Sequence, residues 1–480
     1  MGTRPESSRC VPHGRAEPAP PRRGQAQRGS LSGECPERTR KVIFSEIDCA
    51  QEAISTREPQ MPRLEGSFCP RFHICYNPGL KIEELGEAMK ETVIVSAVRT
   101  PVGRFGGTLK DVTDRAMAAL VIKEAIARAG IEPKDVDEVV FSQQYRTGEL
   151  PANMARVVAI DAGIPIEVPE YTVAKACGGS LKTVFLAAQA IKAGDAEVVV
   201  AGGVESMSNA AYLLTKARWG YRLGHGQLMD QLVLYDPISG NTMGETAENV
   251  AERFKISRED QDLFALGSQK KAAAAMAEGR FDEQIVPVPV PRPKGEPILF
   301  TKDEHPRPDT TLEGLAKLPP VFRQGGTVTA GNSSGMNDGA AALVVMSKEK
   351  AKALGVKPMV SIVGYASVGV EPAIMGIGPV PATKKVLEKT GLTLSDIDLI
   401  ELNEAFASQS IACIRLLGLD EEKLNVNGGA IALGHPISAT GGVILTKLIY
   451  EMKRRGVELG LATMCLGGGQ GVALVVRNEG

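Results

Sequence analysis

Cys177 is the residue whose surroundings most favour nucleophilic chemistry. It opens the block Cys177-Gly178-Gly179-Ser180 at the start of a predicted helix. A thiol at a helix N-terminus feels the positive end of the helix dipole, and neighbouring glycines leave backbone N–H groups free to bind an oxyanion. Both effects predict a thiol pKa below its usual value of about 8.5. The alternative interpretation is a small buried side chain without a chemical role, which holds for many single cysteines.

Two further blocks place functional side chains beside glycine. His435 follows the glycine-rich run Asn427–Gly434, and Cys465 precedes Leu466–Gly471. Glycine at this density permits the backbone to approach a ligand closely and to direct several N–H groups at one oxygen. The other histidines after residue 89 lie in polar loops, so His435 is the candidate for a functional histidine. Asn403 follows a predicted strand and is either a helix cap or an amide that orients a water molecule or a neighbouring histidine.

The elements that must position these residues occur twice along the chain. Asp135–Phe141 matches Asp396–Leu402, and each is a passage from a helix end into a strand. In both copies a helix with one apolar face follows and leads into a second strand. The apolar faces are Leu181, Val184, Phe185 and Ala188, then Leu445, Leu448, Ile449 and Met452, and the strands are Glu197–Ala201 and Leu461–Cys465. If the two halves pack about a pseudo-twofold axis, Cys177 and His435 meet at that axis.

The composition is that of a globular α/β protein. The 480 residues are 43% hydrophobic and 23% charged, which is ordinary for a chain of two or three domains. A net charge of −2 argues against a general nucleic-acid or membrane-surface binder, and no apolar run has the length of a transmembrane helix. From Met89 onward, β-branched runs alternate with amphipathic helices, which predicts a layered α/β fold. Residues 207–331 break this alternation and predict an inserted loop domain.

The first 88 residues differ from the rest of the chain. Residues 1–40 are rich in arginine and proline and lack apolar periodicity, so we expect 1–88 to be a disordered extension. Acidic residues in it argue against an organellar transit peptide. Because Met89 leads directly into the strand Thr92–Ala97, we interpret Met89 as the true start. The cysteines after it, Cys177, Cys413 and Cys465, do not make a disulfide framework, which indicates a reduced, cytoplasmic protein, and we expect no metal site.

Four blocks, in this order, resemble the signature blocks of the thiolases. They are Cys177–Ser180, Asn403–Phe406, Gly434–Pro436 and Cys465–Gly469, and the resemblance also includes Val98–Gly103 and Gly326–Asn332. It extends over 89–480 and is strongest to the acetyl-CoA acetyltransferases. It implies an α/β, duplicated αβαβα layered fold with an inserted loop domain. The N-terminal half would comprise 89–206 and 332–357, the loop domain 207–331 and the C-terminal half 358–480.

The resemblance also implies a mechanism. Cys177, deprotonated by His435, attacks an acyl-CoA and forms an acyl-enzyme thioester. Cys465 then removes a proton from the methyl group of a second acetyl-CoA, and the carbanion attacks the acyl-enzyme to give acetoacetyl-CoA and coenzyme A. One oxyanion is bound by His435 and a water held by Asn403, and the other by the backbone N–H groups of Cys177 and Gly467. In reverse, the same groups cleave a 3-ketoacyl-CoA. No cofactor beyond the CoA thioesters is implied.

The resemblance to thiolases implies substrate contacts at six positions of this chain. The pantetheine and acyl pocket is implied at Met243, Ala330, Ser334 and Ala405, and the adenine end of CoA at Arg307 and Phe322. Arg307 is alternatively a solvated loop charge. Thr242 stands where many short-chain biosynthetic thiolases carry histidine, which leaves the preferred chain length open. The order Cys-Gly-Gly-Ser, where Cys-Gly-Ser-Gly is commoner, is a minor departure.

Two other functions compete with acetyl-CoA C-acetyltransferase activity. A degradative 3-ketoacyl-CoA thiolase of broader chain length is the close alternative. A non-catalytic thiolase-like scaffold is the alternative from another class, although such subunits usually lose the nucleophile or the base, and Cys177 and Cys465 are both present. A ketoacyl-carrier-protein synthase would need a second catalytic histidine where Cys465 stands. The resemblance implies a homodimer or homotetramer, with the loop domain often forming the tetramer contact.

Overall fold

The structure is a computed structural model that describes residues 90–147, 153–233 and 235–480. The predicted extension, residues 1–88, and the proposed start at Met89 lie outside these residues. The domain limits drawn from the resemblance stay a prediction.

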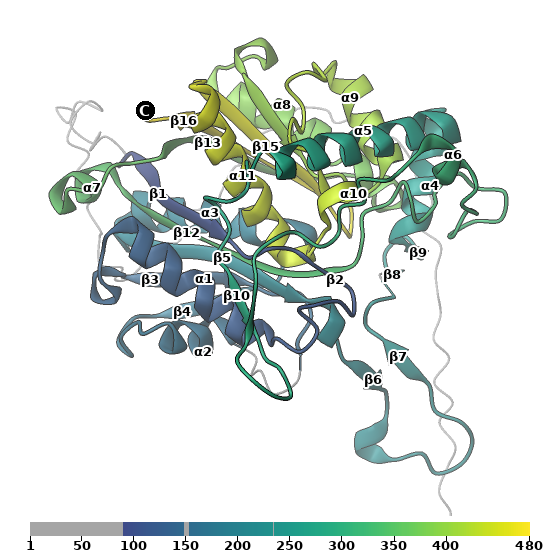
Figure 1. Cartoon of the computed structure of the whole chain (residues 1–480), viewed down its shortest axis with the longest axis horizontal. Helices are drawn as coiled ribbons and strands as arrows, with labels where there is room; N and C mark the ends of the chain where they lie inside the picture. The colour runs from purple at the N-terminus through teal and green to yellow at the C-terminus, as the bar shows by residue number, and fades with distance from the viewer. Residues whose placement is uncertain (1–89, 148–152, 234) are drawn as a thin grey trace, which may run out of the picture. The chain divides into compact units, whose positions relative to one another are not determined.

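A ten-stranded mixed sheet is the centre of the described chain (Figure 1). Its order is β14-β15-β16-β13-β1-β12-β5-β3-β4, and the short β2 pairs with β12. The antiparallel pair β1 and β13, with Val93 opposite Ser361, joins the two halves. The strands are β1 Thr92–Arg99, β2 Gly103–Arg104, β3 Glu138–Ser142, β4 Glu170–Val173, β5 Val198–Ser206, β12 Asn337–Ser347, β13 Val360–Gly369, β14 Leu399–Leu402, β15 Leu459–Leu466 and β16 Gln470–Asn478.

The two halves repeat the same strand pairings, as the internal sequence repeat predicts. β3 is parallel to β5, and β5 is antiparallel to β12; in the second half β14 is parallel to β15, and β15 is antiparallel to β16. The matching aspartates make equivalent hydrogen bonds in the two halves. Asp137 Oδ2 accepts the N–H groups of Glu197 and Val198 at the start of β5, and Asp398 Oδ2 accepts those of Glu458 and Leu459 at the start of β15.

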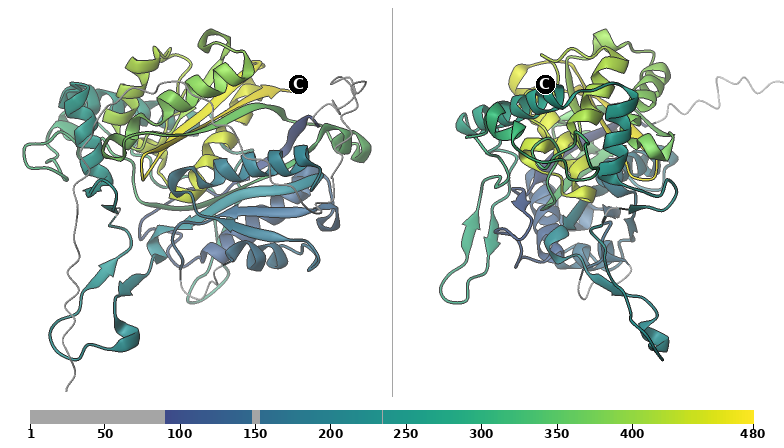
Figure 2. Two further views of the ribbon diagram at one scale, coloured as in Figure 1. Left: turned by 180° about the vertical axis from the view of Figure 1, so that it is seen from behind. Right: turned by 90° about the vertical axis from the view of Figure 1, so that its right-hand side faces the viewer.

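Helices form three layers around the strands of the two halves (Figures 1 and 2). α1 and α2 pack on the strands of the first half, α8 and α9 pack on those of the second, and α3 and α11 share one core with strands of both halves. Both predicted apolar helix faces lie in that shared core. The predicted duplicated αβαβα fold is therefore confirmed. The helices are α1 Asp114–Ala129, α2 Met154–Asp161, α3 Gly179–Ala193, α8 Pro379–Thr390, α9 Ala407–Leu417 and α11 Thr440–Arg455, with the short α7 Lys348–Leu354 and α10 Ala430–Leu433.

The segment between β5 and β12 supplies helices beside the sheet and a projecting arm. The β6–β7 arm, residues 212–230, extends away from the sheet and helices (Figure 2). A fully buried ion pair between Arg99 of β1 and Asp303, at 2.7 Å, anchors the later part of the segment to the sheet. Its elements are β6 Tyr212–Leu214, β7 Leu228–Asp230, β8 Tyr235–Asp236, β9 Asn241–Thr242, α4 Met243–Arg253, α5 Arg258–Ala277, β10 Val288–Val290, β11 Ile298–Phe300 and α6 Leu312–Ala316.

Candidate active site

Cys177 lies in a tight turn between β4 and α3. The turn is the 3-10 segment η3, Ala176–Gly178, and Ala176 has a φ of 43°, a left-handed conformation that residues with a side chain rarely adopt. The Ala176 N–H donates to Gln144 Oε1 at 3.1 Å. Glycine is required at position 178 because a Cβ there would lie 2.6 Å from the Leu466 side chain at the end of β15. The turn therefore brings the Cys177 backbone against the second half of the protein.

The Cys177 thiol is protonated in the empty site, and the predicted low pKa is wrong. Burial raises the pKa of Cys177 to about 11, and the backbone N–H groups of Gly467 and of Cys177 itself only partly offset this effect. The helix α3 begins at Gly179, two residues beyond the thiol, so desolvation outweighs the helix dipole. The side chain stays partly exposed, which leaves it accessible to a substrate. Its deprotonation therefore requires a base.

His435 lies beside a turn that packs against the turn of Cys177. It precedes the 3-10 turn η8, Ile437–Ala439, which contacts η3. Asn337 Oδ1 accepts the His435 backbone N–H at 2.9 Å, and Nδ1 lies 2.6 Å from Thr440 Oγ1. Burial lowers the pKa of His435 to about 4, so the ring is neutral at pH 7. With the proton on Nδ1, donated to Thr440, the buried Nε2 has no partner among the described residues and can accept a proton.

Cys465 lies next to this pair, at the end of β15. Its side chain is 0% exposed, and burial raises its pKa well above the usual range, with the neighbouring Cys177 and Cys413 adding to the effect. Apolar side chains surround it, so burial disfavours the ionised thiolate in the empty site. The surrounding apolar cluster comprises Met243, Ala247, Phe322, Val328, Met375, Ala405 and Phe406.

Asn403 presents an unpaired amide in the protein interior. It follows β14 directly, and its backbone N–H donates to Thr463 O at 3.0 Å. The helix α9 is capped at Phe406, so the helix-cap interpretation of Asn403 is wrong. The side chain is 1% exposed, and neither amide atom has a hydrogen-bond partner among the described residues. A buried polar atom left unpaired costs about 1–3 kcal/mol, which indicates a site for a water molecule or a ligand.

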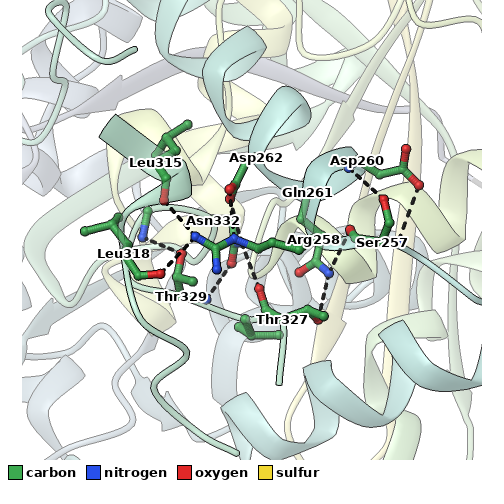
Figure 3. A network of polar contacts seen from close by, with 12 residues as sticks. Ser257, Arg258, Asp260, Gln261, Asp262, Leu315, Leu318, Thr327, Thr329 and Asn332 are labelled. Carbon is green, nitrogen blue, oxygen red and sulfur yellow. Dashed lines mark hydrogen bonds and ion pairs between the residues drawn. The ribbon is translucent and has the colours of Figure 1, made fainter. Parts of the chain in front are cut away.

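The segment Gly326–Asn332, which is part of the thiolase resemblance, is held by α5 (Figure 3) and by α4. Asn332 Nδ2 donates to Asp262 Oδ1 at 3.0 Å, and Glu248 of α4 accepts the N–H groups of residues 327 and 328. Arg258 donates to the carbonyls of Leu315 and Leu318, which fixes the chain leading into the segment. Such buried, fully paired contacts make the segment rigid before any substrate binds.

The structure brings most of the predicted substrate contacts to Cys465. Met243, Phe322 and Ala405 belong to the apolar cluster around its sulfur, and the Ser334 N–H donates to Ala405 O at 3.0 Å. Two further predicted positions are exposed and line no part of this cluster. Ala330 follows the buried Val328 and Thr329, and Arg307 has its backbone N–H bound to Gln269 of α5.

Comparison with known proteins decides the family. Residues 92–349 match the model of the thiolase N-terminal domain, and residues 356–478 match that of the thiolase C-terminal domain. This chain belongs to the thiolase family. It is 55% identical over 395 residues to the acetyl-CoA acetyltransferase of Syntrophomonas wolfei, covering 81% of this chain and 99% of that protein.

Solved structures are similar to this thiolase over the same part of the chain. The Bacillus anthracis acetyl-CoA acetyltransferase is 50% identical with a TM-score of 0.80, covering 81% of this chain and 99% of that one. The human mitochondrial 3-ketoacyl-CoA thiolase in complex with CoA is 42% identical with a TM-score of 0.79, covering 82% and 99%.

Sequence reasoning missed four residues near the thiolase site. Asn337 and Thr440 hold His435, Met375 packs in the cluster around Cys465, and Glu205 lies near Cys177. A polar residue next to a long apolar strand is a signal that would have found Asn337 and Glu205. Asn337 is the first residue of β12, and Glu205 follows the apolar run of β5. Met375 and Thr440 carry no such signal, because their roles depend on what packs against them.

Neither a metal site nor a membrane-spanning helix is found in the described part of this thiolase. Across 90–147, 153–233 and 235–480, no three or more His, Cys, Asp or Glu side chains are placed to hold a metal ion. In the same ranges, no helix has both the length and the apolar character that crossing a bilayer requires.

Proposed function

We propose that this thiolase is an acetyl-CoA C-acetyltransferase, which converts two acetyl-CoA molecules into acetoacetyl-CoA and coenzyme A and catalyses the reverse thiolysis. The observation that carries the proposal is the packing of the Cys177 turn against the His435 turn and against β15, which carries Cys465, with Nε2 of His435 and the amide of Asn403 both unpaired. Relatives named acetyl-CoA acetyltransferase, at 50–55% identity, support the choice of substrate.

In the first half-reaction Cys177 is acylated. Because the thiol pKa is about 11 and the imidazole pKa about 4, a thiolate–imidazolium pair is unfavourable in the empty site. The proton therefore moves to His435 Nε2 as the sulfur attacks the acetyl carbonyl of acetyl-CoA. The bond from that carbon to the CoA sulfur breaks, the CoA thiolate takes the proton from His435, and coenzyme A leaves.

In the second half-reaction Cys465 acts as the base. It passes its own proton to His435 Nε2, and the resulting thiolate removes a proton from the methyl group of the second acetyl-CoA. The carbanion attacks the acetyl-Cys177 thioester, the bond from the acetyl carbon to Cys177 breaks, and acetoacetyl-CoA forms. His435 returns its proton to the expelled Cys177 thiolate, which restores both thiols and the neutral imidazole. The site residues supply the acid–base chemistry, so we propose no cofactor beyond the CoA thioesters.

Two oxyanion sites stabilise the charges that develop. The backbone N–H groups of Cys177 and Gly467, which already favour the Cys177 thiolate, are placed to bind the oxyanion of the acyl-enzyme step. His435 Nε2, when protonated, and a water bound by Asn403 are placed to bind the thioester oxygen of the second substrate. Each donor of this kind is worth about 10²–10³ in rate.

A degradative 3-ketoacyl-CoA thiolase is the second candidate. The Thr242 hydroxyl accepts the Glu245 N–H and donates to the Glu245 carboxylate in a capping box at the start of α4. It is therefore committed to the helix and does not replace a histidine contact to pantetheine. The likeness to the human mitochondrial 3-ketoacyl-CoA thiolase also favours this candidate.

CoA-dependent thiolysis by the full-length protein separates these functions. We expect cleavage of acetoacetyl-CoA and little cleavage of a 3-keto-C8 thioester, and comparable rates on both would assign the degradative function. Cys177→Ser should abolish acyl-enzyme formation, observed as loss of the acetyl adduct in intact-mass spectra. An inactive parent that is folded would instead support a scaffold.

We further propose a homotetramer that acts in the cytoplasm. The β6–β7 arm exposes apolar side chains to an extent that favours contact with another copy of the chain, with Trp219 at 88% and Leu223 at 97% exposed. The mechanism needs Cys177 and Cys465 as free thiols, and a reducing compartment keeps them so.

A further inference from the structure

Glu205 is an acidic side chain buried where the two halves of the protein meet. It is 0% exposed and lies near the end of β5, after a run of apolar residues. Its carboxylate accepts three backbone N–H groups: those of Gln144 and Ser438 bind Oε2 at 3.2 Å each, and that of Tyr145 binds Oε1 at 3.0 Å. The carboxylate is thus held by three separate points of the backbone.

These contacts connect Glu205 to the turn that contains Cys177 and to the turn that follows His435. Ser438 belongs to η8, three residues after His435. Gln144 donates its backbone N–H to Glu205 and accepts the N–H of Ala176 on its side-chain oxygen at 3.1 Å. Ala176 is the residue with left-handed backbone that directly precedes Cys177. One carboxylate therefore links the turn of the nucleophile with the turn of the base.

The surrounding backbone is shaped for this link. A Cβ at Gly203 would lie 2.5 Å from Ser438 O, so glycine is required for η8 to pack against β5. Gly339, which is opposite Glu205 in the β5–β12 pair, would bring a Cβ to 3.3 Å from Pro436. The glycines thus allow the His435 turn to come close enough for Ser438 to reach the carboxylate.

The charge of Glu205 acts on the nucleophile as well. Burial raises the pKa of Glu205 to about 7, against the lowering effect of its N–H donors. The ionised carboxylate raises the pKa of Cys177. Titratable groups on the adjoining elements are Tyr145 after β3, Asp338 of β12, Cys177 of η3 and His435 before η8. A buried acid whose charge is offset by backbone N–H groups and the Ser438 side chain is costly to retain, which indicates a role beyond packing.

We propose that Glu205 is a positioning residue of the thiolase reaction: it sets the placement of Cys177 relative to His435 by binding both turns. This inference rests on the proposed function. The conservative variant Glu205→Gln keeps the shape, removes the charge and turns one acceptor oxygen into a donor that faces N–H groups.

Glu205→Gln separates this role from simple packing. We expect kcat for thiolysis of acetoacetyl-CoA to fall by about 10- to 100-fold, because small misplacements of reacting groups have effects of this size. KM should change by less than about twofold, since no substrate contact is lost. The pH profile for iodoacetamide alkylation of Cys177 should shift to lower pH, because a carboxylate that disfavours the thiolate is gone.

Asp137→Asn is the matched control. Asp137 also accepts two backbone N–H groups, but at the other end of β5. The control should keep kcat and the alkylation profile of the parent. A folded Glu205→Gln protein that also keeps both would overturn the proposal.

Gln144→Met tests the link without altering the carboxylate. It removes the acceptor for Ala176, so kcat should fall while the alkylation profile stays near that of the parent. If Glu205→Gln fails to fold, an unchanged kcat in Gln144→Met overturns the proposal. Alkylation needs no substrate, so it tests the charge effect even if thiolysis is absent and the proposed function fails.

Discussion

At the scale of single residues, the site contains a thiol that is accessible but has a high pKa. Cys177 is partly exposed, yet its pKa is about 11 because burial outweighs the nearby N–H groups. A thiol of high pKa is scarce as thiolate at neutral pH but yields a strongly nucleophilic sulfur once deprotonated. The neutral His435, with Nε2 unpaired, supplies the base. Storing the proton on Cys177 until attack begins protects the thiol from other electrophiles.

The pH dependence of Cys177 alkylation tests this balance. Thiolate is the reactive species, and the raised pKa places its formation at high pH, so the rate constant with iodoacetamide should rise about tenfold per pH unit between about pH 7 and pH 10. Mass spectrometry of the peptide that carries Cys177 measures the rate, and Cys177→Ser supplies the blank. A plateau near pH 8 would contradict the raised pKa and restore the helix-dipole expectation.

At the scale of elements, a buried ion pair fixes the strand and loop that carry two site residues. Lys447 of α11 and Glu401 of β14 are 2% and 4% exposed, and Lys447 Nζ lies 2.9 Å from Glu401 Oε2. The same ammonium donates to Gly428 O at 2.6 Å. β14 leads to Asn403, and the loop at Gly428 leads to His435. The pair therefore sets these two elements relative to each other.

Lys447→Met should destabilise the protein strongly. It leaves Glu401 buried without its cation, a change that typically costs 3–5 kcal/mol, roughly, of unfolding free energy. Urea denaturation measures the loss. The double variant Lys447→Met with Glu401→Leu removes both charges and should recover most of the stability. If the unfolding free energy of Lys447→Met lies within about 1 kcal/mol of that of the parent, water or another group compensates the charge of the Glu401 carboxylate.

At the scale of the whole molecule, the β6–β7 arm leaves apolar side chains that the described chain does not cover. They include Tyr212, Leu213, Leu214, Trp219, Leu223, Leu228 and Met229. A monomer rarely exposes such a continuous apolar surface. Assembly of identical chains with closed symmetry would bury it.

Replacing Trp219 and Leu223 together by aspartate should therefore reduce the assembly. Two buried charges would oppose the contact, so we expect a tetrameric parent and a dimeric variant in sedimentation-velocity experiments. The single variant Leu299→Asp, on the separate β10–β11 hairpin, serves as a control at a residue that is 62% exposed. An unchanged mass in the double variant would place the assembly contact elsewhere.

What the sequence alone determines here is local and repeated. The alternation of strands and helices, the two helices with apolar faces and the matching aspartates at 137 and 398 predict the duplicated fold, because periodicity and capping act over a few residues. The glycine-flanked Cys177, His435 and Cys465 point to their chemistry because a side chain beside so much glycine signals close backbone approach. These features need no knowledge of what packs where.

Only the tertiary structure decided the properties that depend on burial and on distant partners. The pKa of Cys177 lies above the helix-dipole expectation because desolvation comes from residues far along the chain. Asn403 is a free amide because the helix cap is Phe406, three residues after the cap position that the sequence suggested. Glu205 acquires its contact to the turn of His435 when the halves pack together. Desolvation and long-range hydrogen bonds are sums over the folded environment, and no short stretch of sequence contains them.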